Sequence, residues 1–144
     1  MNVMGLPEHA VRDDPLARDR AALVSVLPHP SLRPFVQAYW FVKDIDGLHE
    51  GQPIHTAPHA GAVLTVNIGR PNAMIDGPLV PAVSLLGVQT EARQWRSWAE
   101  TYFVMALLSP AGLVRLFPHA GSWARDRLIE LNAVVGDLQA HRLS

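Results

Sequence analysis

The sequence predicts a mainly β domain, a small barrel or sandwich with helices gathered on one side at its C-terminal end. The 12 prolines and 10 glycines are dispersed, and they cut the chain into short segments. The apolar segments between them are about 4–8 residues long, as strands are, and several alternate apolar with polar residues. About six to eight short strands followed by helices are typical of a sheet with helices segregated to one side.

The segment Thr101–Leu108 is the most apolar run of the chain and is expected to be its central strand. It is too short for a typical helix, and its tyrosine, phenylalanine and valine favour a strand buried on both faces. Ser109 then offers an N-cap, and Pro110 suits the first position of a helix. We expect a short helix from Pro110 that Pro118 brings to an end.

The remaining elements are assigned from turn residues and from hydrophobic spacing. Further strands are expected at 36–42, 53–56, 62–68, 73–75, 82–90 and 93–98, the last pairing with 101–108 through a tight turn. Gly87, inside one of these strands, predicts a bulge or a close backbone approach. Helices are expected at 15–26, capped by Asp14, and at 123–131, capped by Ser122. Sequential hairpins would close such a sheet and remove its edges.

These elements divide the chain into three parts. Residues 1–27 are expected to form a tail and a short helix, 28–109 the β-barrel, and 110–144 the C-terminal helices.

Composition excludes several classes of protein. The net charge is −1 without any basic cluster, so this chain by itself is expected to bind nucleic acid poorly. It has no cysteine, which excludes disulfides, thiolate metal sites and cysteine nucleophiles. No apolar run approaches the roughly 20 residues of a membrane-spanning helix, and the acidic N-terminus does not resemble a signal peptide. We expect a soluble, cytoplasmic protein.

Motifs for catalysis are missing, so neither an enzyme nor a cofactor is expected. There is no G-x-S-x-G sequence, no carboxylate pair on a predicted strand and no glycine-rich phosphate loop. His55 and His59 are four residues apart, but Pro58 between them excludes the helical geometry of many zinc sites. They are interpreted either as histidines at a loop or rim, or as contacts to a ligand or metal.

Aromatic residues are the better indication of a binding function. Trp40, Trp95, Trp98 and Tyr102 all lie in or near predicted strands. Trp95 and Trp98 differ by three positions, so in a strand they would point to opposite faces. Inward aromatic side chains often line an apolar ligand cavity, although they also simply fill cores.

Several motifs occur in a fixed order along the chain. The first is P-x-P-x-L-x-P-x-V-x-x-Y-W at 28–40, and the second is a proline–glycine turn and a strand ending N-x-G-x-P at 67–71. A strand with a central G-x-Q at 87–89, the S-P-A-G corner at 109–112 and the sequence L-I-E-L-N-A-V-V-G-D-L at 128–138 follow. Together they resemble the N-terminal domain of a subgroup of AraC-type transcription regulators.

This resemblance implies a cupin-like β-barrel that senses an effector or mediates dimerisation. In that family a separate C-terminal pair of helix-turn-helix units binds DNA, and this chain contains no such part. We therefore expect a small-molecule effector, a homodimer, and DNA contact only through a C-terminal domain absent from this chain. An effector in the barrel would favour one arrangement of the terminal helices.

Two groups of residues are predicted to carry these roles. The ligand-binding candidates are Trp40, His55, Asn67, Gln89 and Trp98, and the dimer-contact candidates are Trp123, Arg127, Leu128 and Leu131. For each of them, ordinary packing is the alternative interpretation, because terminal helices often cover their own barrel. Two other functions stay open: a stand-alone small-molecule-binding protein, and a metal-dependent cupin enzyme that uses His55 and His59.

Overall fold

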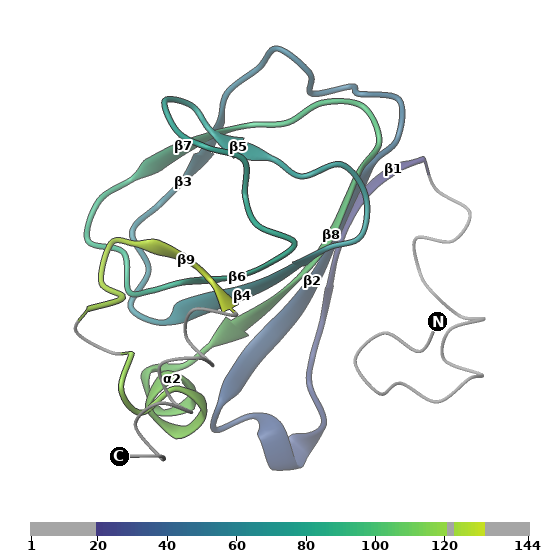
Figure 1. Ribbon diagram of the computed structural model, residues 1–144. Helices are drawn as coiled ribbons and strands as arrows, with labels where there is room; N and C mark the ends of the chain where they lie inside the picture. Colours follow the sequence, from purple (N-terminus) through teal and green to yellow (C-terminus); the bar gives the residue numbers. More distant parts are fainter. Residues whose placement is uncertain (1–19, 121–122, 132–144) are drawn as a thin grey trace.

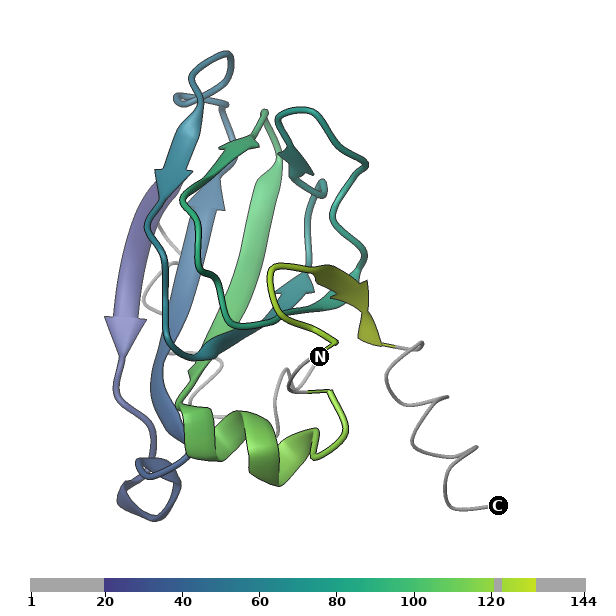
Figure 2. The same ribbon diagram turned by 90° about the vertical axis from the view of Figure 1, so that its left-hand side faces the viewer.

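The computed structural model describes residues 20–120 and 123–131 (Figure 1). This part of the chain forms nine strands in two antiparallel sheets and one short α-helix. The prediction of a mainly β fold is confirmed. The two sheets form an open sandwich, and neither sheet closes into a barrel (Figure 2). Sequential hairpins therefore do not remove the edges as expected, because β1 and β9 are the outer strands of the large sheet.

The large sheet has six strands in the order β1-β2-β8-β4-β6-β9. Their bounds are β1 Ala21–Val26, β2 Val36–Asp44, β8 Thr101–Leu108, β4 Ala62–Asn67, β6 Val83–Leu86 and β9 Leu128–Glu130. The small sheet has the order β3-β7-β5, with β3 Ile54–Thr56, β7 Arg93–Arg96 and β5 Ala73–Met74. All seven predicted strands between 36 and 108 coincide with an observed strand, and β6 is the one most shortened.

Strand β8 is the centre of the large sheet, as its sequence predicts. It pairs with β2 on one side and with β4 on the other along its length. Val104, Ala106 and Leu108 point to one face and are almost completely buried. This face is covered by α2 (Pro110–Leu116) and by the segment that follows it, through Leu113, Phe117 and Ala124. We call it the helix-side face.

The corner after β8 forms the expected helix start. The Ser109 hydroxyl accepts a hydrogen bond from the Gly112 N–H at 3.0 Å and donates one to the Pro34 carbonyl at 2.7 Å. A Cβ on Gly112 would lie 2.0 Å from the carbonyl oxygen of Phe35, so only glycine lets the helix approach the start of β2 this closely. Ser109 thus caps α2 and also fixes it to the large sheet.

The prediction of a helix at 15–26 is wrong for the part that the structure describes, because Ala21–Val26 form strand β1. The sequence of β1 contains two valines, whose branched side chains favour strands. Its six residues pair with Lys43, Val42 and their neighbours along β2, so tertiary pairing decides the structure of this segment. The residues before Arg20 lie outside the described part.

The helix predicted at 123–131 is also wrong. A turn at 123–126 is followed by β9, which pairs with β6. Asp126 adopts φ 55°, in the left-handed region, and a helix cannot pass through that conformation. The expected capping residue, Ser122, lies outside the described residues.

The expected hairpin between 93–98 and 101–108 is wrong as well, because the two strands belong to different sheets. β7 pairs with β3 and β5, whereas β8 pairs with β2 and β4. Glu100 has φ 64° in the connection, where the chain passes from the small sheet to the large one. Strands adjacent in sequence are not always adjacent in a sheet.

The close backbone approach expected at Gly87 is confirmed. A Cβ at this position would lie 1.9 Å from the carbonyl oxygen of Ala124, and the Gly87 N–H donates to the Arg127 carbonyl at 3.2 Å. The glycine therefore lets the 123–127 segment lie directly against the end of β6.

We predict that Gly87→Ala lowers the free energy of unfolding by about 3 kcal/mol, because the methyl group displaces backbone. Gly51→Ala is the control, since a Cβ there meets nothing within 4 Å and its cost is limited to the positive φ of 81°. Urea unfolding of both variants and of the wild-type chain measures the difference. Equal stability of the two variants would contradict the packing described for Gly87.

Candidate functional site

The face of the large sheet opposite α2 is turned toward the small sheet, and we call it the inner face. Val63, Leu86 and Leu128 of the large sheet pack with Trp95, Val80 and Met74 in one apolar cluster. Trp95 is in β7 and Met74 in β5, so this cluster joins the two sheets. Because side chains alternate along each strand and paired residues share a face, this cluster also identifies which other side chains face the small sheet.

Apart from Asp44 and Thr101, which pair at its end, strand register sorts the inner face into three rows of side chains that run across the sheet. The first row, which contains the large-sheet side of the inter-sheet cluster, is Ala38, Leu107, Val63, Leu86 and Leu128. The second is Ser25, Trp40, Met105, Thr65, Ser84 and Glu130, and the third is Leu23, Val42, Phe103 and Asn67.

The parts of the second and third rows on β2, β8 and β4 form an apolar surface that we call the inner wall. It consists of Trp40, Val42, Phe103, Met105 and Thr65, all of which are half-buried. Within the described residues, none of its four apolar members packs against either core cluster. On the helix-side face, Tyr39 and Leu64 pack against the core, whereas Phe41 and Val66 are half-buried outside it. The inner wall is therefore half-buried apolar surface that belongs to neither described core cluster.

Few polar groups face this wall. The Trp40 indole N–H and the Thr65 hydroxyl make no hydrogen bond with any described residue. Ser84, beside Thr65 in the same row, is fully buried and its hydroxyl oxygen has no partner in the described part of the chain. The Asn67 amide donates to the Pro81 carbonyl at 2.9 Å. The wall thus offers the Trp40 indole donor and the Thr65 hydroxyl to a bound molecule, because the Ser84 hydroxyl is fully buried.

The structure brings two of the five predicted ligand-binding residues to this face. Trp40 belongs to the inner wall and Asn67 lies at its end, next to Phe103. His55 lies beside Gln94 and is exposed, on the side of the small sheet opposite to Trp95.

The other two predicted ligand residues have local roles that the structure explains. The Trp98 N–H donates to the Pro71 carbonyl at 2.8 Å, and its ring lies 4.7 Å from the Arg70 guanidinium. Gln89 is buried beyond the end of β6, where its backbone pairs with that of His59. Its side-chain oxygen has no partner in the described residues. Neither belongs to the three rows.

The predicted dimer-contact residues lie in the last described segment. Leu128 is in β9 and packs in the inter-sheet cluster, while Leu131 packs against the core on the helix side. The Arg127 guanidinium lies 5.6 Å from the centre of the Trp123 ring. Leu128 and Leu131 therefore contact their own domain, and a contact with a second copy stays a prediction.

The histidine pair does not form a metal centre of the usual kind. The ring Nδ1 of His59 accepts a hydrogen bond from the Gly61 N–H at 3.1 Å. Across residues 20–120 and 123–131, no three histidine, aspartate or glutamate side chains are grouped as metal ligands. In the same residues, no helix combines the length and apolarity needed to cross a membrane.

Sequence reasoning missed Val42, Phe103, Met105, Thr65 and Ser84 as candidate residues. The alternation along 101–108 places Phe103 and Met105 on one face, and this signal was present in the sequence. Which face is covered depends on where the small sheet and α2 pack, and an apolar run does not encode that.

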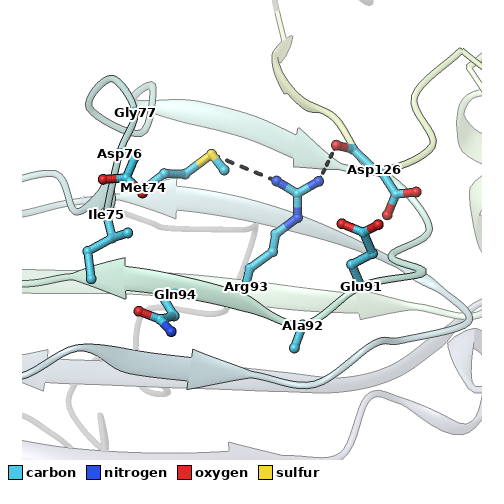
Figure 3. Close-up of a pocket in the computed structure, with 9 residues that line it drawn as sticks. All are labelled: Met74, Ile75, Asp76, Gly77, Glu91, Ala92, Arg93, Gln94 and Asp126. Atoms are coloured by element: carbon cyan, nitrogen blue, oxygen red, sulfur yellow. Dashed lines mark hydrogen bonds between the residues drawn. The ribbon is translucent and has the colours of Figure 1, made fainter.

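A pocket of about 360 Å³ with several polar and charged lining residues lies at the end of the small sheet (Figure 3). It is lined by Met74, Ile75, Asp76, Gly77, Glu91, Ala92, Arg93, Gln94 and Asp126. The Arg93 guanidinium spans it, donating to the Asp126 carbonyl on one side and to the Met74 sulfur at 3.8 Å on the other. Through these two terminal nitrogens Arg93 joins β5 and β7 to the 123–127 turn, and its Nε is buried without a partner in the described residues.

Asp126 completes this connection. Its carboxylate accepts hydrogen bonds from the Thr90 N–H at 2.7 Å and from the Thr90 hydroxyl at 2.6 Å. The hydrogen bonds from the Thr90 side chain and backbone lower the pKa of the Asp126 carboxyl, since they favour its charged form. Thr90, Arg93 and Asp126 thus tie the connection between β6 and β7 to the turn that precedes β9. We call these three residues the Asp126 clamp.

Comparison with known proteins identifies a family but no characterised relative. Residues 24–130 match a family described as a domain of unknown function, DUF6597. No curated protein matches the chain, and no solved structure does. The matched region begins within β1 and ends with β9, so it contains the inner wall and the Asp126 clamp.

The lowered pKa of Asp126 predicts how stability depends on pH. Because the folded-state pKa lies below the unfolded value of about 3.9, the clamp stabilises fully above about pH 4. This contribution is lost as the pH falls through the folded-state pKa. Asp126→Asn, which tolerates the same left-handed backbone, should melt a few degrees below the wild-type chain at pH 7.

The difference in melting temperature between Asp126→Asn and wild type should shrink toward zero in strong acid. Asp46, whose pKa is also lowered, by its hydrogen bonds with Arg20, titrates in both proteins and cancels in the comparison. Thermal unfolding followed by circular dichroism across this pH range is the measurement. A difference that persists undiminished in acid would show that the Asp126 charge does not act as described.

Proposed function

This chain belongs to the DUF6597 family, and from that premise we propose that it binds a small molecule on its inner wall. The observation that supports the proposal is a set of large, half-buried apolar side chains on the inner face that belong to neither described core cluster. Protein interiors are normally close-packed, so Trp40, Phe103 and Met105 outside these clusters favour a site that a ligand fills. In this proposal the domain is the effector-sensing and dimerisation half of an AraC-type transcription regulator.

Strand pairing connects the inner wall to β9, and in this proposal that connection transmits ligand binding. Ser84 and Thr65 lie beside each other in the second row, and the next residue of that row is Glu130 of β9. β9 leads to the C-terminal end of the domain, and the Asp126 clamp holds the turn before it. A ligand that binds one arrangement of this region more tightly than another shifts the population toward that arrangement.

The partners in this proposal are a second copy of the chain and, through a separate C-terminal part, DNA. The proposed location is the cytoplasm. With a net charge of −1 and no basic cluster, the domain itself is not the DNA-binding part. The same inner wall supports the second candidate, a stand-alone small-molecule-binding protein. The native coding sequence after Ser144 separates the two: a pair of helix-turn-helix units supports the regulator, and a stop codon supports the stand-alone protein.

Binding at the inner wall is tested by screening a metabolite library for compounds that raise the melting temperature. Met105→Trp fills the wall, and Val114→Trp is the matched control because Val114 is 63% exposed on α2. We expect compounds that stabilise the wild-type and Val114→Trp chains but have little effect on Met105→Trp. The proposal fails if no compound raises the melting temperature, or if the same compounds stabilise Met105→Trp equally.

A further inference from the structure

The inner wall contains no charged side chain, and Glu130, the charged residue at the β9 end of the second row, is not free of partners. Asp44, which ends β2, is 4% exposed and accepts hydrogen bonds from the backbone of Leu48 and His49 at 2.8 and 3.0 Å. Arg93 of the small sheet donates to Asp126 and Met74 through its two terminal nitrogens, and its Nε is buried without a partner in the described residues. A charged ligand on the wall would lose hydration without gaining a free counter-charge, which is costly.

The shape of the wall suits a flat molecule. Trp40 and Met105 are direct neighbours across β2 and β8. Val42 and Phe103 form the next pair on the same face, toward Asp44 and Thr101. Neighbouring strands are about 5 Å apart and alternate residues about 7 Å apart, so these four side chains form a block roughly the size of a small aromatic ring system. Trp40 and Phe103 lie diagonally in this block, where both can contact one bound ring.

The polar groups of the wall set its hydrogen-bonding capacity. The Trp40 N–H can only donate, so a molecule held there must supply an acceptor. Thr65 adds one hydroxyl group in the same row, where the neighbouring Ser84 is fully buried. A sugar carries more hydroxyl groups than these can pair, and each unpaired polar group that becomes buried destabilises the complex.

We propose that the inner wall binds an uncharged, flat and largely apolar molecule, of the aromatic class, that accepts a hydrogen bond from Trp40. This inference rests on the proposed small-molecule function and narrows it to one chemical class. It assigns Trp40 the role of orienting the ligand, and Phe103 and Met105 the role of apolar contact.

Three naphthalene probes that differ in charge test the inference: neutral 2-naphthol, anionic 2-naphthoate and the cation of 2-naphthylmethylamine. Their affinities for the wild-type chain at pH 7 are measured by isothermal titration calorimetry. We expect 2-naphthol to bind at least about tenfold more tightly than either ion, because neither finds a counter-charge. Equal or tighter binding of either ion overturns the inference. For 2-naphthoate, such a result would indicate that its carboxylate pairs with Arg93.

Trp40→Phe tests the hydrogen bond, since it keeps an aromatic ring and removes the N–H. We expect this substitution to lower the affinity for 2-naphthol by about threefold to tenfold. The affinity for naphthalene, which has no hydrogen-bond acceptor, should be nearly unchanged. An equal effect on both probes overturns the role assigned to Trp40. Naphthalene binding also shows that the variant is folded and that the wall is intact.

The library screen and the probe titrations fail in distinguishable ways. If metabolites stabilise the chain through the inner wall but 2-naphthol does not bind, the ligand class is wrong and the binding function stands. If neither the library nor any probe binds, the proposed function itself is wrong.

Discussion

The pairing of β8 with its two neighbours is the constraint on which the other features of this domain depend. β8 lies between β2 and β4, and it links β1 on one side to β6 and β9 on the other. Side chains alternate along a strand, so a shift of one residue in this register would exchange the two faces. Ala106 and Leu108 would then leave the helix-side core, and Phe103 and Met105 would leave the inner face. One register therefore places both the core and the candidate site.

The two faces of the large sheet serve different purposes. On the helix-side face, α2 and the segment after it bring Leu113, Phe117 and Ala124 onto the sheet, and burial of this surface stabilises the fold. On the inner face, the small sheet packs mainly near Leu86 and Trp95 and leaves the inner wall half-buried. Because stability comes largely from the first face, the wall can remain available to a ligand.

Local sequence signals account for much of the fold. Alternation and turn residues located the strands from 36 to 108, and Ser109 with Pro110 located the start of α2. The wrong assignments, at β1 and β9, concern the two edge strands, whose structure depends on pairing with β2 and β6 rather than on local sequence. The expected β7–β8 hairpin failed for a similar reason, because sheet membership is decided by non-local pairing. For the site, Trp40 was identified as an aromatic residue in a strand. Met105 and Phe103 were not, since an apolar run does not indicate which face stays uncovered.

The most direct test of the inner wall is the methyl NMR spectrum of the chain labelled with ¹³C at its methionines, during titration with 2-naphthol. Met105 lies in the wall and Met74 lines the polar pocket, so the two methyl groups report on different sites. Met105→Leu assigns the signal. We predict a saturable shift of the Met105 methyl that is larger than any shift of Met74, with intermolecular NOEs to the naphthol ring. A shift confined to Met74, or no saturable shift at all, would contradict a ligand site on the inner wall.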